Sequence, residues 1–480
     1  MEKIFLFDVP DKMIMDPVHG AIHLFDHEMS VVDHPLFQRL KYILQNDVVF
    51  MVFPGCGHNR FSHSIGTMHI AGRYFRKLTI EYLKKSKINE LEDDQAEAIV
   101  YIYRCTRLAA LLHDTGHSPF SHQFETVPKI QELYNEDGFI ANLFANLNME
   151  EIFGQTPSKI KHEFFSVRSS LEILHSVQDL PVDTVDVLYF MEGTKIKLSK
   201  KLSESGKAFI SIFFKKDWEN HLDTRFISVE TAIKDLFDLL KNIISGELDA
   251  DKMDYILRDS YYSGCNYGKY NLDHLINNLR VGYEIIWDNL KLKNLQLSIA
   301  INEKGLGALE DFIYARFQLY QELYNHKSVS GFRKLLTLAI EEVITEKEEE
   351  IKQSLSTNEQ FAHFTDTFFW ESFRSISKSN PSSISKKIVF RHKPNYITKL
   401  EKKNLQEVKF ECQKIGSEKG KEVVYWQSNI KFSSINEFYD DIKILAKDHN
   451  GNVSLKKITD VTDFFEKFKR EEIYHLFTLE

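Results

Sequence analysis

The chain has 480 residues, of which 43% are hydrophobic and 27% are charged, and its net charge is -9. This length allows one large domain or two to three ordinary ones, and the composition is that of a globular protein with a sizeable core. The acidic balance argues against a bulk nucleic-acid binder, although a local basic patch remains compatible with it.

The cysteines and the start of the chain exclude further classes. The cysteines form no C-x-x-C pair, so we predict neither a disulfide framework nor a zinc ribbon. The first residues lack the pattern of a signal peptide, and no run of about 18 apolar residues predicts a membrane-spanning helix. We therefore expect a location in a reducing cytoplasm. The many phenylalanines and tyrosines, 37 and 20, predict an aromatic-rich core.

The first part of the chain is predicted to be helical after a short irregular start. A turn at residues 16–20 precedes a short strand at residues 21–24. Apolar residues at helical spacing predict a helix over residues 35–45, a second helix with His63 in its first turns, and a third over residues 94–112.

The middle of the chain continues this helical pattern. An amphipathic stretch begins at His162, and another covers residues 229–244. Residues 193–226 are rich in lysine and serine, and we interpret residues 208–214 within them as a strand or a surface insertion. A helix starting near residue 248 places Asp251, Tyr255 and Asp259 on one face. A helix over residues 306–327 does the same for Arg316, Tyr320 and Tyr324.

After about residue 346 the periodicity changes. Residues 341–355 predict an exposed charged helix, and residues 375–385 predict a loop. Residues 387–391 and 423–426 predict strands, and the end of the chain, residues 460–476, predicts a helix. The expected fold is therefore mostly α, with a large helical core and a smaller C-terminal α+β region.

The stretch L-L-H-D-T-G-H-S-P-F-S-H, which contains His113, Asp114 and His117, carries the chemistry. Asp114 directly follows His113, so both side chains point inward only where a helix ends, and Thr115-Gly116 supplies that break. His113 and Asp114, together with His63 and Asp251, offer two imidazoles and two carboxylates. This set suits a first-row divalent metal better than calcium. A metal held in this way keeps open positions for water and a phosphate oxygen.

Further side chains complete a hypothetical phosphate-ester site. His117 and His162 are candidates for proton transfer, and Glu125 is a candidate to orient one of them. Arg60, Lys252 and Arg316 are the expected clamps for a polyphosphate. Taken singly, each histidine is as often structural, Asp251 is more often a helix cap, and the tyrosines are more often core residues. A functional metal site is favoured because three motifs occur together in one chain, namely H-N-R-F-S-H, H-D-T-G-H and D-x-D-K-M-D-Y.

These motifs resemble those of the HD-domain metal phosphohydrolases, and most closely the SAM- and HD-domain type of deoxynucleoside triphosphate (dNTP) triphosphohydrolase and its bacterial dGTPase-like relatives. The resemblance extends over about residues 12–330, and no SAM domain is apparent. The matching segments are D-P-V-H-G from residue 16, F-Q-R-L-K-Y from residue 37, the stretch from F-P-G at residue 53 to H-S-I-G at residue 66, H-D-T-G-H-S-P-F-S-H from residue 113, residues 249–259, and Y-N-H-K from residue 324.

The resemblance implies a role for each matching residue. The metal ligands would be His63, His113, Asp114 and Asp251. The catalytic histidines would be His117 and His162, with Glu125 as their acidic partner where the family usually has aspartate. The residues that line the nucleotide site would be Gln45, Arg60, His122, Lys252, Tyr255, Asp259, Arg316 and Tyr324. Gln45 and Tyr324 would face the sugar and crowd out a ribose 2′-hydroxyl, and Tyr320 stands where close relatives have a histidine.

The resemblance also implies regulation. Relatives hydrolyse a dNTP to deoxynucleoside and triphosphate, and many form dimers, tetramers or other oligomers with activating nucleotides between subunits. The guanine-reading positions of that activator site correspond to Asp33, Gln38 and Arg39. Lys12 aligns in the flanking segment, but Met15 stands where a polar residue is usual.

We therefore predict a metal-dependent dNTP triphosphohydrolase whose HD domain covers residues 1–345, with an insertion at about 193–226. Residues 346–480 would form a regulatory or oligomerising region. The metal would be iron, manganese, magnesium or zinc, and the ligand set does not distinguish among them. The alternatives are an HD phosphodiesterase that acts on a cyclic nucleotide or single-stranded nucleic acid, and a non-catalytic nucleotide sensor. Family habits suggest nucleotide homeostasis or defence against phage.

Overall fold

The structure is a computed structural model that describes residues 10, 12–85, 91–136, 138–144, 152, 161–192, 196–214, 229–288, 291–401, 403–430, 442–447, 453–464 and 471–479. As the sequence predicts, these residues are mostly helical, and sheets take a minor share. None of the described helices combines the length and the apolar character that a membrane span needs.

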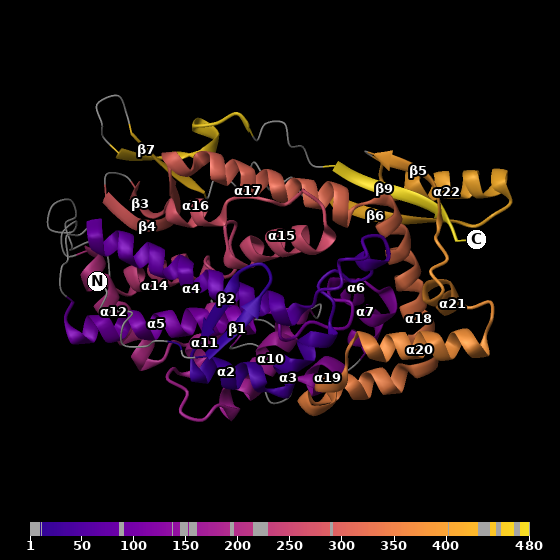
Figure 1. The fold of residues 1–480 in the computed structure, drawn as a ribbon, viewed down its shortest axis with the longest axis horizontal. Helices are drawn as coiled ribbons and strands as arrows, with labels where there is room; N and C mark the ends of the chain where they lie inside the picture. Colours follow the sequence, from indigo (N-terminus) through magenta and orange to yellow (C-terminus); the bar gives the residue numbers. More distant parts are fainter. Residues whose placement is uncertain are drawn as a thin grey trace.

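The N-terminal part is a short hairpin followed by a helical core (Figure 1). The hairpin and the core helices up to the motif are β1 (Lys12–Asp16), β2 (Gly20–Leu24), α2 (Asp26–Asp33), α3 (Pro35–Gln38), α4 (Arg60–Lys85) and α5 (Asp93–Leu112). Short 3-10 turns lie at Arg39–Tyr42 and Val49–Met51. Helix α4 packs along α5, and this long pair carries the motif at one end.

Further helices follow the motif in the chain. They are α6 (His122–Glu125), α7 (Pro128–Tyr134), α8 (Phe139–Leu143), α10 (His162–Ser176), α11 (Thr184–Glu192), α12 (Lys200–Phe214), α14 (Val229–Lys241), α15 (Ala250–Ser263) and α16 (Leu272–Asn277). Helix α15 packs across α4, and α11 and α12 pack on α5. A hairpin, β3 (Leu279–Asp288) and β4 (Lys291–Asn302), then leads into α17 (Leu306–Gln318).

A π-helical turn (Leu319–Tyr324) joins α17 to α18 (Lys327–Ser356). Helix α18 spans the expected domain boundary and is kinked there at Lys347, whose φ of -135° and ψ of 33° are not helical. The elements that follow are α19 (Asn358–His363), α20 (Asp366–Ser379), α21 (Ile384–Val389), β5 (Asn395–Glu401), α22 (Leu405–Lys419), β6 (Val423–Ile430), β7 (Lys443–Lys447), β8 (Val453–Lys457), a 3-10 turn (Ile458–Asp460) and β9 (Glu471–Thr478). Helices α18 to α21 share the core of the N-terminal helices.

The C-terminal strands separate into two sheets at opposite ends of the molecule (Figure 1). Strands β7 and β8 extend the β3–β4 hairpin through a parallel pairing of β4 with β7. Strands β5, β9 and β6 form an antiparallel sheet between α18 and α22. The C-terminal α+β character is confirmed, but its strands are divided between these two places.

An aromatic cluster joins the motif to the helices after α18. The ring of Phe120 lies 5.8 Å from Phe369 and 6.2 Å from Phe373, and Phe124 lies 5.7 Å from Phe364. All five rings are buried. Each buried ring removes a large apolar surface from water, so this cluster fixes α19 and α20 against the segment that follows the motif. The predicted aromatic-rich core is present here.

Four local predictions were wrong. Residues 208–214 belong to helix α12, where Phe209, Ile210 and Ile212 are buried, because a short apolar run fits a helix as well as a strand. Residues 193–195 and 215–226 of the expected insertion lie outside the described part of the chain. Residues 384–389 form α21 where a strand was predicted from residue 387, and α20 extends into the expected loop up to Ser379. Residues 471–476 of the predicted C-terminal helix belong to strand β9, which is paired on both sides, and residues 465–470 lie outside the described part of the chain.

Gly116 permits the contact between the motif and α10. A Cβ atom at Gly116 would lie 1.9 Å from the backbone nitrogen of Ser166 and 2.4 Å from the carbonyl oxygen of His162. Both neighbours are backbone atoms and cannot rotate away. We predict that Gly116→Ala lowers the free energy of unfolding by about 1–3 kcal/mol, as overpacking does, measured by urea denaturation.

Gly57→Ala is the matched control, because a Cβ atom at Gly57 would meet no atom within 4 Å. Equal unfolding midpoints for the two variants would contradict the packing role of Gly116.

Candidate metal centre and substrate pocket

Three helices bring the predicted metal ligands together. His63 lies in the first turn of α4, Asp251 lies in the first turn of α15, and His113 is the C-cap of α5. The helix ends at this point, so Asp114 in the following turn also points into the site. This is the helix end that the H-D doublet predicts.

The ligand atoms converge closely enough to share one ion. His63 Nε2 lies 3.0 Å from Asp251 Oδ1 and 3.5 Å from Asp114 Oδ2. His113 Nε2 lies 3.4 Å from Asp114 Oδ1 and 3.8 Å from Asp251 Oδ1. Metal–ligand bonds of about 2 Å place neighbouring ligand atoms roughly 3 Å apart. Both Nε2 atoms are buried without a hydrogen-bond partner. His63, His113, Asp114 and Asp251 therefore fit a divalent metal.

The other ring nitrogen of each histidine has a partner that orients the ring. His113 Nδ1 lies 2.8 Å from the carbonyl oxygen of Ala110, so it donates and leaves Nε2 as the acceptor. His63 Nδ1 lies 2.8 Å from Asp254 Oδ2. A carboxylate behind a metal-binding histidine raises its basicity and fixes its orientation.

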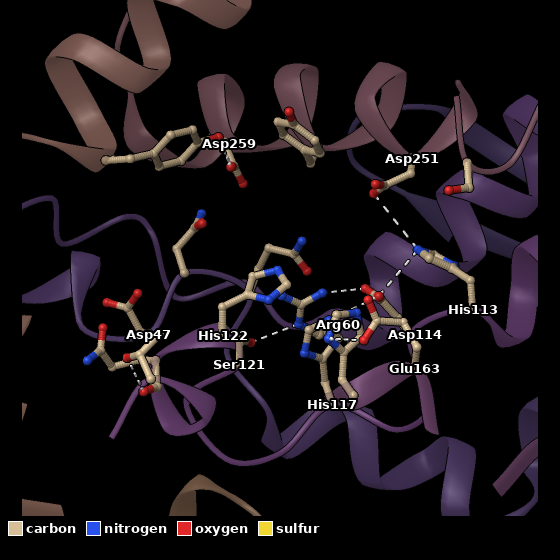
Figure 2. A pocket seen from close by; sticks show the side chains of 18 of the residues that line it. Asp47, Arg60, His113, Asp114, His117, Ser121, His122, Glu163, Asp251 and Asp259 are labelled. Atoms are coloured by element: carbon tan, nitrogen blue, oxygen red, sulfur yellow. Dashed lines mark hydrogen bonds and ion pairs between the residues drawn. The ribbon is translucent and has the colours of Figure 1, made fainter. Parts of the chain in front are cut away.

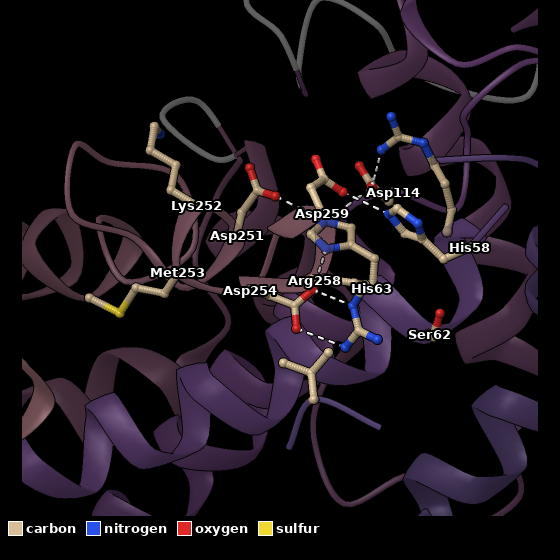
Figure 3. A network of polar contacts seen from close by, with 12 residues as sticks. His58, Ser62, His63, Asp114, Asp251, Lys252, Met253, Asp254, Arg258 and Asp259 are labelled. Atoms are coloured by element: carbon tan, nitrogen blue, oxygen red, sulfur yellow. Dashed lines mark hydrogen bonds and ion pairs between the residues drawn. The ribbon is translucent and has the colours of Figure 1, made fainter. Parts of the chain in front are cut away.

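Asp254 is the centre of a buried polar network that connects three segments (Figure 3). Its carboxylate accepts from Arg258 Nε and Nη2 at 2.8 and 2.9 Å, and it lies 2.6 Å from His19 Nε2. Arg258 Nη1 donates to Asp16 Oδ2 at 2.8 Å. The Asp254 side chain is fully buried, so these charges are compensated within the protein and the β1–β2 turn is held to α15.

The charges at the site favour a cation. Burial opposes a charge on His63, but the neighbouring carboxylates of Asp251 and Asp254 raise its pKa to about 10. Burial also opposes ionisation of Asp114, but the Arg60 guanidinium and the histidines hold the pKa of Asp114 well below its usual range. The histidines lower the pKa of Asp251 in the same way. The carboxylates therefore stay anionic, and their negative charge favours a cation at this point, either a proton on His63 or a metal ion.

His117 and His162 form a stacked pair beside this centre, with ring centroids 3.9 Å apart. Burial, Arg60 and His162 lower the pKa of His117 well below its ordinary value. Burial also disfavours a charge on His162, but the hydrogen bond with Glu125, whose Oε1 lies 3.2 Å from His162 Nδ1, raises its pKa. A proton shared by the pair therefore resides on His162. The longer Glu125 side chain does reach its histidine.

The segment after the motif is held in an uncommon backbone conformation. Phe120 and Ser121 have φ values of 57° and 55°, a region that costs non-glycine residues about 1–3 kcal/mol each. Asp366 of α20 accepts from the backbone nitrogens of Phe120 and Leu44, at 2.7 and 3.0 Å. Ser121 Oγ accepts from Arg60 Nε at 2.8 Å and donates to the carbonyl oxygen of Leu44 at 2.8 Å. These contacts fix the segments that carry Gln45 and His122.

The centre opens into a pocket of about 450 Å³ (Figure 2). Most of the predicted substrate residues line it, namely Gln45, Arg60, His122, Tyr255, Asp259 and Tyr324. The Tyr324 hydroxyl contacts Asp259, whose Oδ1 lies 2.7 Å from His58 Nε2. Lys252 and Arg316 are not among the lining residues. Lys252 Nζ instead donates to Asp249 Oδ2 and the carbonyl oxygen of Gly246, each at 2.6 Å.

The residues of the expected activator site do not all lie at the surface. Asp33 is exposed, Gln38 is half-buried and donates to the carbonyl oxygen of Val32 at 2.7 Å, and Lys12 is exposed near Asp26. Arg39 is buried, and its guanidinium donates to the backbone carbonyls of Phe364, Thr115 and His117. Arg39 therefore supports the motif from within, and the exposed cation of this turn is Lys41.

Sequence reasoning missed several residues of the site. The supporting pair Asp254 and Arg258 has the four-residue spacing of a helical ion pair, which was a usable signal. Asp47, Arg333 and Trp426 line the pocket without any motif that marks them. Arg333 Nη2 lies 2.9 Å from Asp47 Oδ2, although the two residues are far apart in the sequence and meet only in the folded chain.

Comparison with known proteins agrees with this geometry. The HD domain family matches residues 60–150, which include three of the expected metal ligands and the H-D-T-G-H run. The chain contains an HD domain and is distantly related to the SAMHD1 triphosphohydrolases. It is 29% identical over 329 residues, 66% of this chain, to the deoxynucleoside triphosphate triphosphohydrolase SAMHD1 of Bos taurus, and 28% identical over 341 residues, 71% of this chain, to an uncharacterized protein of Methanocaldococcus jannaschii.

This HD-domain chain matches only about half of the length of these relatives, 45% and 52% respectively. Its fold is similar to two solved structures. A hypothetical protein from Aquifex aeolicus has a TM-score of 0.60 at 23% identity and covers 98% of this chain and 96% of its own. A phosphohydrolase from Bacteroides thetaiotaomicron has a TM-score of 0.59 at 22% identity and covers 98% and 100%.

Removing the charge behind His63 tests how the metal site is supported. We predict that Asp254→Asn lowers metal affinity by about 10- to 100-fold, because His63 loses its anionic partner. Chelator competition followed by metal analysis measures this affinity.

Asp273→Asn is the control, since Asp273 also contacts an arginine, Arg73, but is 76% exposed. Unchanged metal affinity in folded Asp254→Asn protein would contradict the supporting role.

Proposed function

We propose that this protein is a metal-dependent dNTP triphosphohydrolase that releases deoxynucleoside and inorganic triphosphate. The observation that carries the proposal is the His63–His113–Asp114 cluster with Asp251, which opens directly into a pocket lined by Gln45, Asp259 and Tyr324. The activity in the name of the SAMHD1 relatives supports the same reaction.

The protein's own groups would divide the work along the pocket. A divalent ion on His63, His113, Asp114 and Asp251 would supply an acidic water and neutralise phosphate charge. Arg60 is buried and its orientation is fixed by Ser121 and Asp114, so it is placed to bind phosphate oxygens without reorganisation. Gln45 and Tyr324 would enclose the deoxyribose.

His162 is our candidate for the general acid. The bond between the α-phosphorus and the sugar 5′ oxygen breaks, water supplies the new oxygen on phosphorus, and the leaving oxygen takes a proton from His162. Glu125 keeps His162 charged, and the neutral His117 packs against it. Proton donation by a positioned group typically contributes a factor of about 10²–10⁴.

Regulation by nucleotides between subunits remains part of the proposal. Asp33 and Lys12 are exposed on the N-terminal segment, and Gln38 is half-buried. Arg39 is buried, and its guanidinium donates to the carbonyl oxygen of His117. Hydrolysis of a dNTP only in a mixture of dNTPs would reveal such an activator. Equal rates for single and mixed dNTPs would refute it.

Product analysis tests the reaction. The metal-loaded protein should convert a dNTP to deoxynucleoside and triphosphate, separated by ion-exchange chromatography. Release of nucleoside monophosphate would instead support an HD phosphodiesterase, and binding without turnover would support a nucleotide sensor. We predict that Asp251→Ala reduces turnover by more than about 100-fold, beyond the effect typical of residues that only support a ligand.

Asp311→Ala, at an exposed position of α17, should retain the activity of the parent protein. Full activity of Asp251→Ala would refute the assignment of Asp251 to the metal.

The pH profile tests the proton donor. The acid form of His162 is present below its raised pKa and is lost as pH rises through that pKa. Glu125→Gln removes the anionic partner, so the alkaline limb of log kcat/KM against pH should move to lower pH.

Glu132→Gln, an exposed carboxylate on α7, should leave the limb in place. A limb that moves to higher pH in Glu125→Gln, or does not move, would contradict the role of His162.

A further inference from the structure

Strand β6 of the C-terminal sheet has two distinct faces. Side chains alternate along a strand, so Val423 and Tyr425 lie on one face of β6, and Trp426 and Ser428 lie on the other. Val423 and Tyr425 pack against the buried cluster of Val408 and Cys412 on α22. Ser428 Oγ lies 3.4 Å from Ser330 Oγ on α18. The even-numbered face of β6 is therefore turned toward α18 and the HD core.

Trp426 lies on this even-numbered face and lines the catalytic pocket. Of the described residues that line the pocket, Trp426 is the only one that comes from the chain after Arg333. Its neighbour on β9 is His475, whose Nδ1 lies 3.1 Å from Ser330 Oγ. A residue of the C-terminal sheet thus reaches the cavity of the HD domain over the first turns of α18.

Trp426 belongs to the end of the pocket opposite the metal ligands. Arg333, one helical turn after Ser330, binds Asp47 through Nη2 at 2.9 Å and donates to the carbonyl oxygen of Tyr324 at 2.6 Å. Figure 2 shows Asp47 on the opposite side of the pocket from His113 and Asp251. The charges of Asp47 and Arg333 satisfy each other, and the indole of Trp426 adds a flat aromatic surface to the pocket.

We propose that Trp426 is a binding platform that stacks on the nucleobase of the substrate. This inference rests on the proposed function. With phosphates at the metal end and the sugar beside Gln45 and Tyr324, the base must extend toward Asp47 and Trp426. An aromatic ring stacks on any base, so this contact strengthens binding without selecting one base. The C-terminal sheet is then part of the substrate site.

Three variants test the platform. Trp426→Ala should raise KM for every dNTP by roughly tenfold, within the range that stacking contributes per base, and change kcat little. Trp426→Phe should restore most of the affinity. Tyr425→Ala is the matched control, because it removes an aromatic ring from the same strand on the face that packs on α22. Thermal unfolding of each variant checks that the sheet is intact.

Inhibition by the two products separates the ends of the pocket. Trp426→Ala should weaken inhibition by a deoxynucleoside and leave inhibition by inorganic triphosphate unchanged. Equal weakening of both, or a KM that matches the parent protein, would overturn the inference. If the parent protein releases no triphosphate, the proposed function fails. Equilibrium dialysis of a deoxynucleoside against the parent and Trp426→Ala proteins then still tests the stacking contact, and equal binding would refute it.

Discussion

The buried carboxylate of Asp254 is the constraint on which the catalytic centre depends. It joins α15 to α4 through His63 and to the N-terminal hairpin through His19 and the Arg258–Asp16 contact. An uncompensated charge at this depth would cost several kcal/mol, so each partner must be present for the others to stay buried. The geometry of His63 is therefore set by residues that do not touch the pocket.

Close helix crossings make this arrangement possible. A Cβ atom at Gly66 would lie 2.0 Å from Asp254 Oδ1, so only glycine lets α4 approach the network. On the other side of the centre, Asp366 and the rings of Phe369 and Phe373 hold the left-handed backbone at Phe120. The C-terminal helices thus support the motif from behind, and the motif and its support form one core.

The pocket changes character along its length. Ionised carboxylates, imidazoles and Arg60 lie at one end of the pocket. Trp426 and the ion pair of Asp47 with Arg333, whose charges compensate each other, lie at the other end. A ligand that is anionic at one end and flat and apolar at the other matches this gradient. A nucleotide has that shape and charge, and Trp426 lies beyond residue 346, whereas the metal ligands precede it.

The sequence by itself determined the helical class, the two ends of α5, the start of α15, and the residues that meet at the metal centre. These features depend on local periodicity and on motifs that can be recognised in the sequence itself. It failed for residues 208–214 and for β9, because short apolar runs adopt the structure that their neighbours impose. Only the tertiary structure decided that Arg39 faces inward, that Asp254 supports His63, and that Trp426 reaches the pocket. Each of these depends on contacts between residues far apart in the chain, which no local pattern encodes.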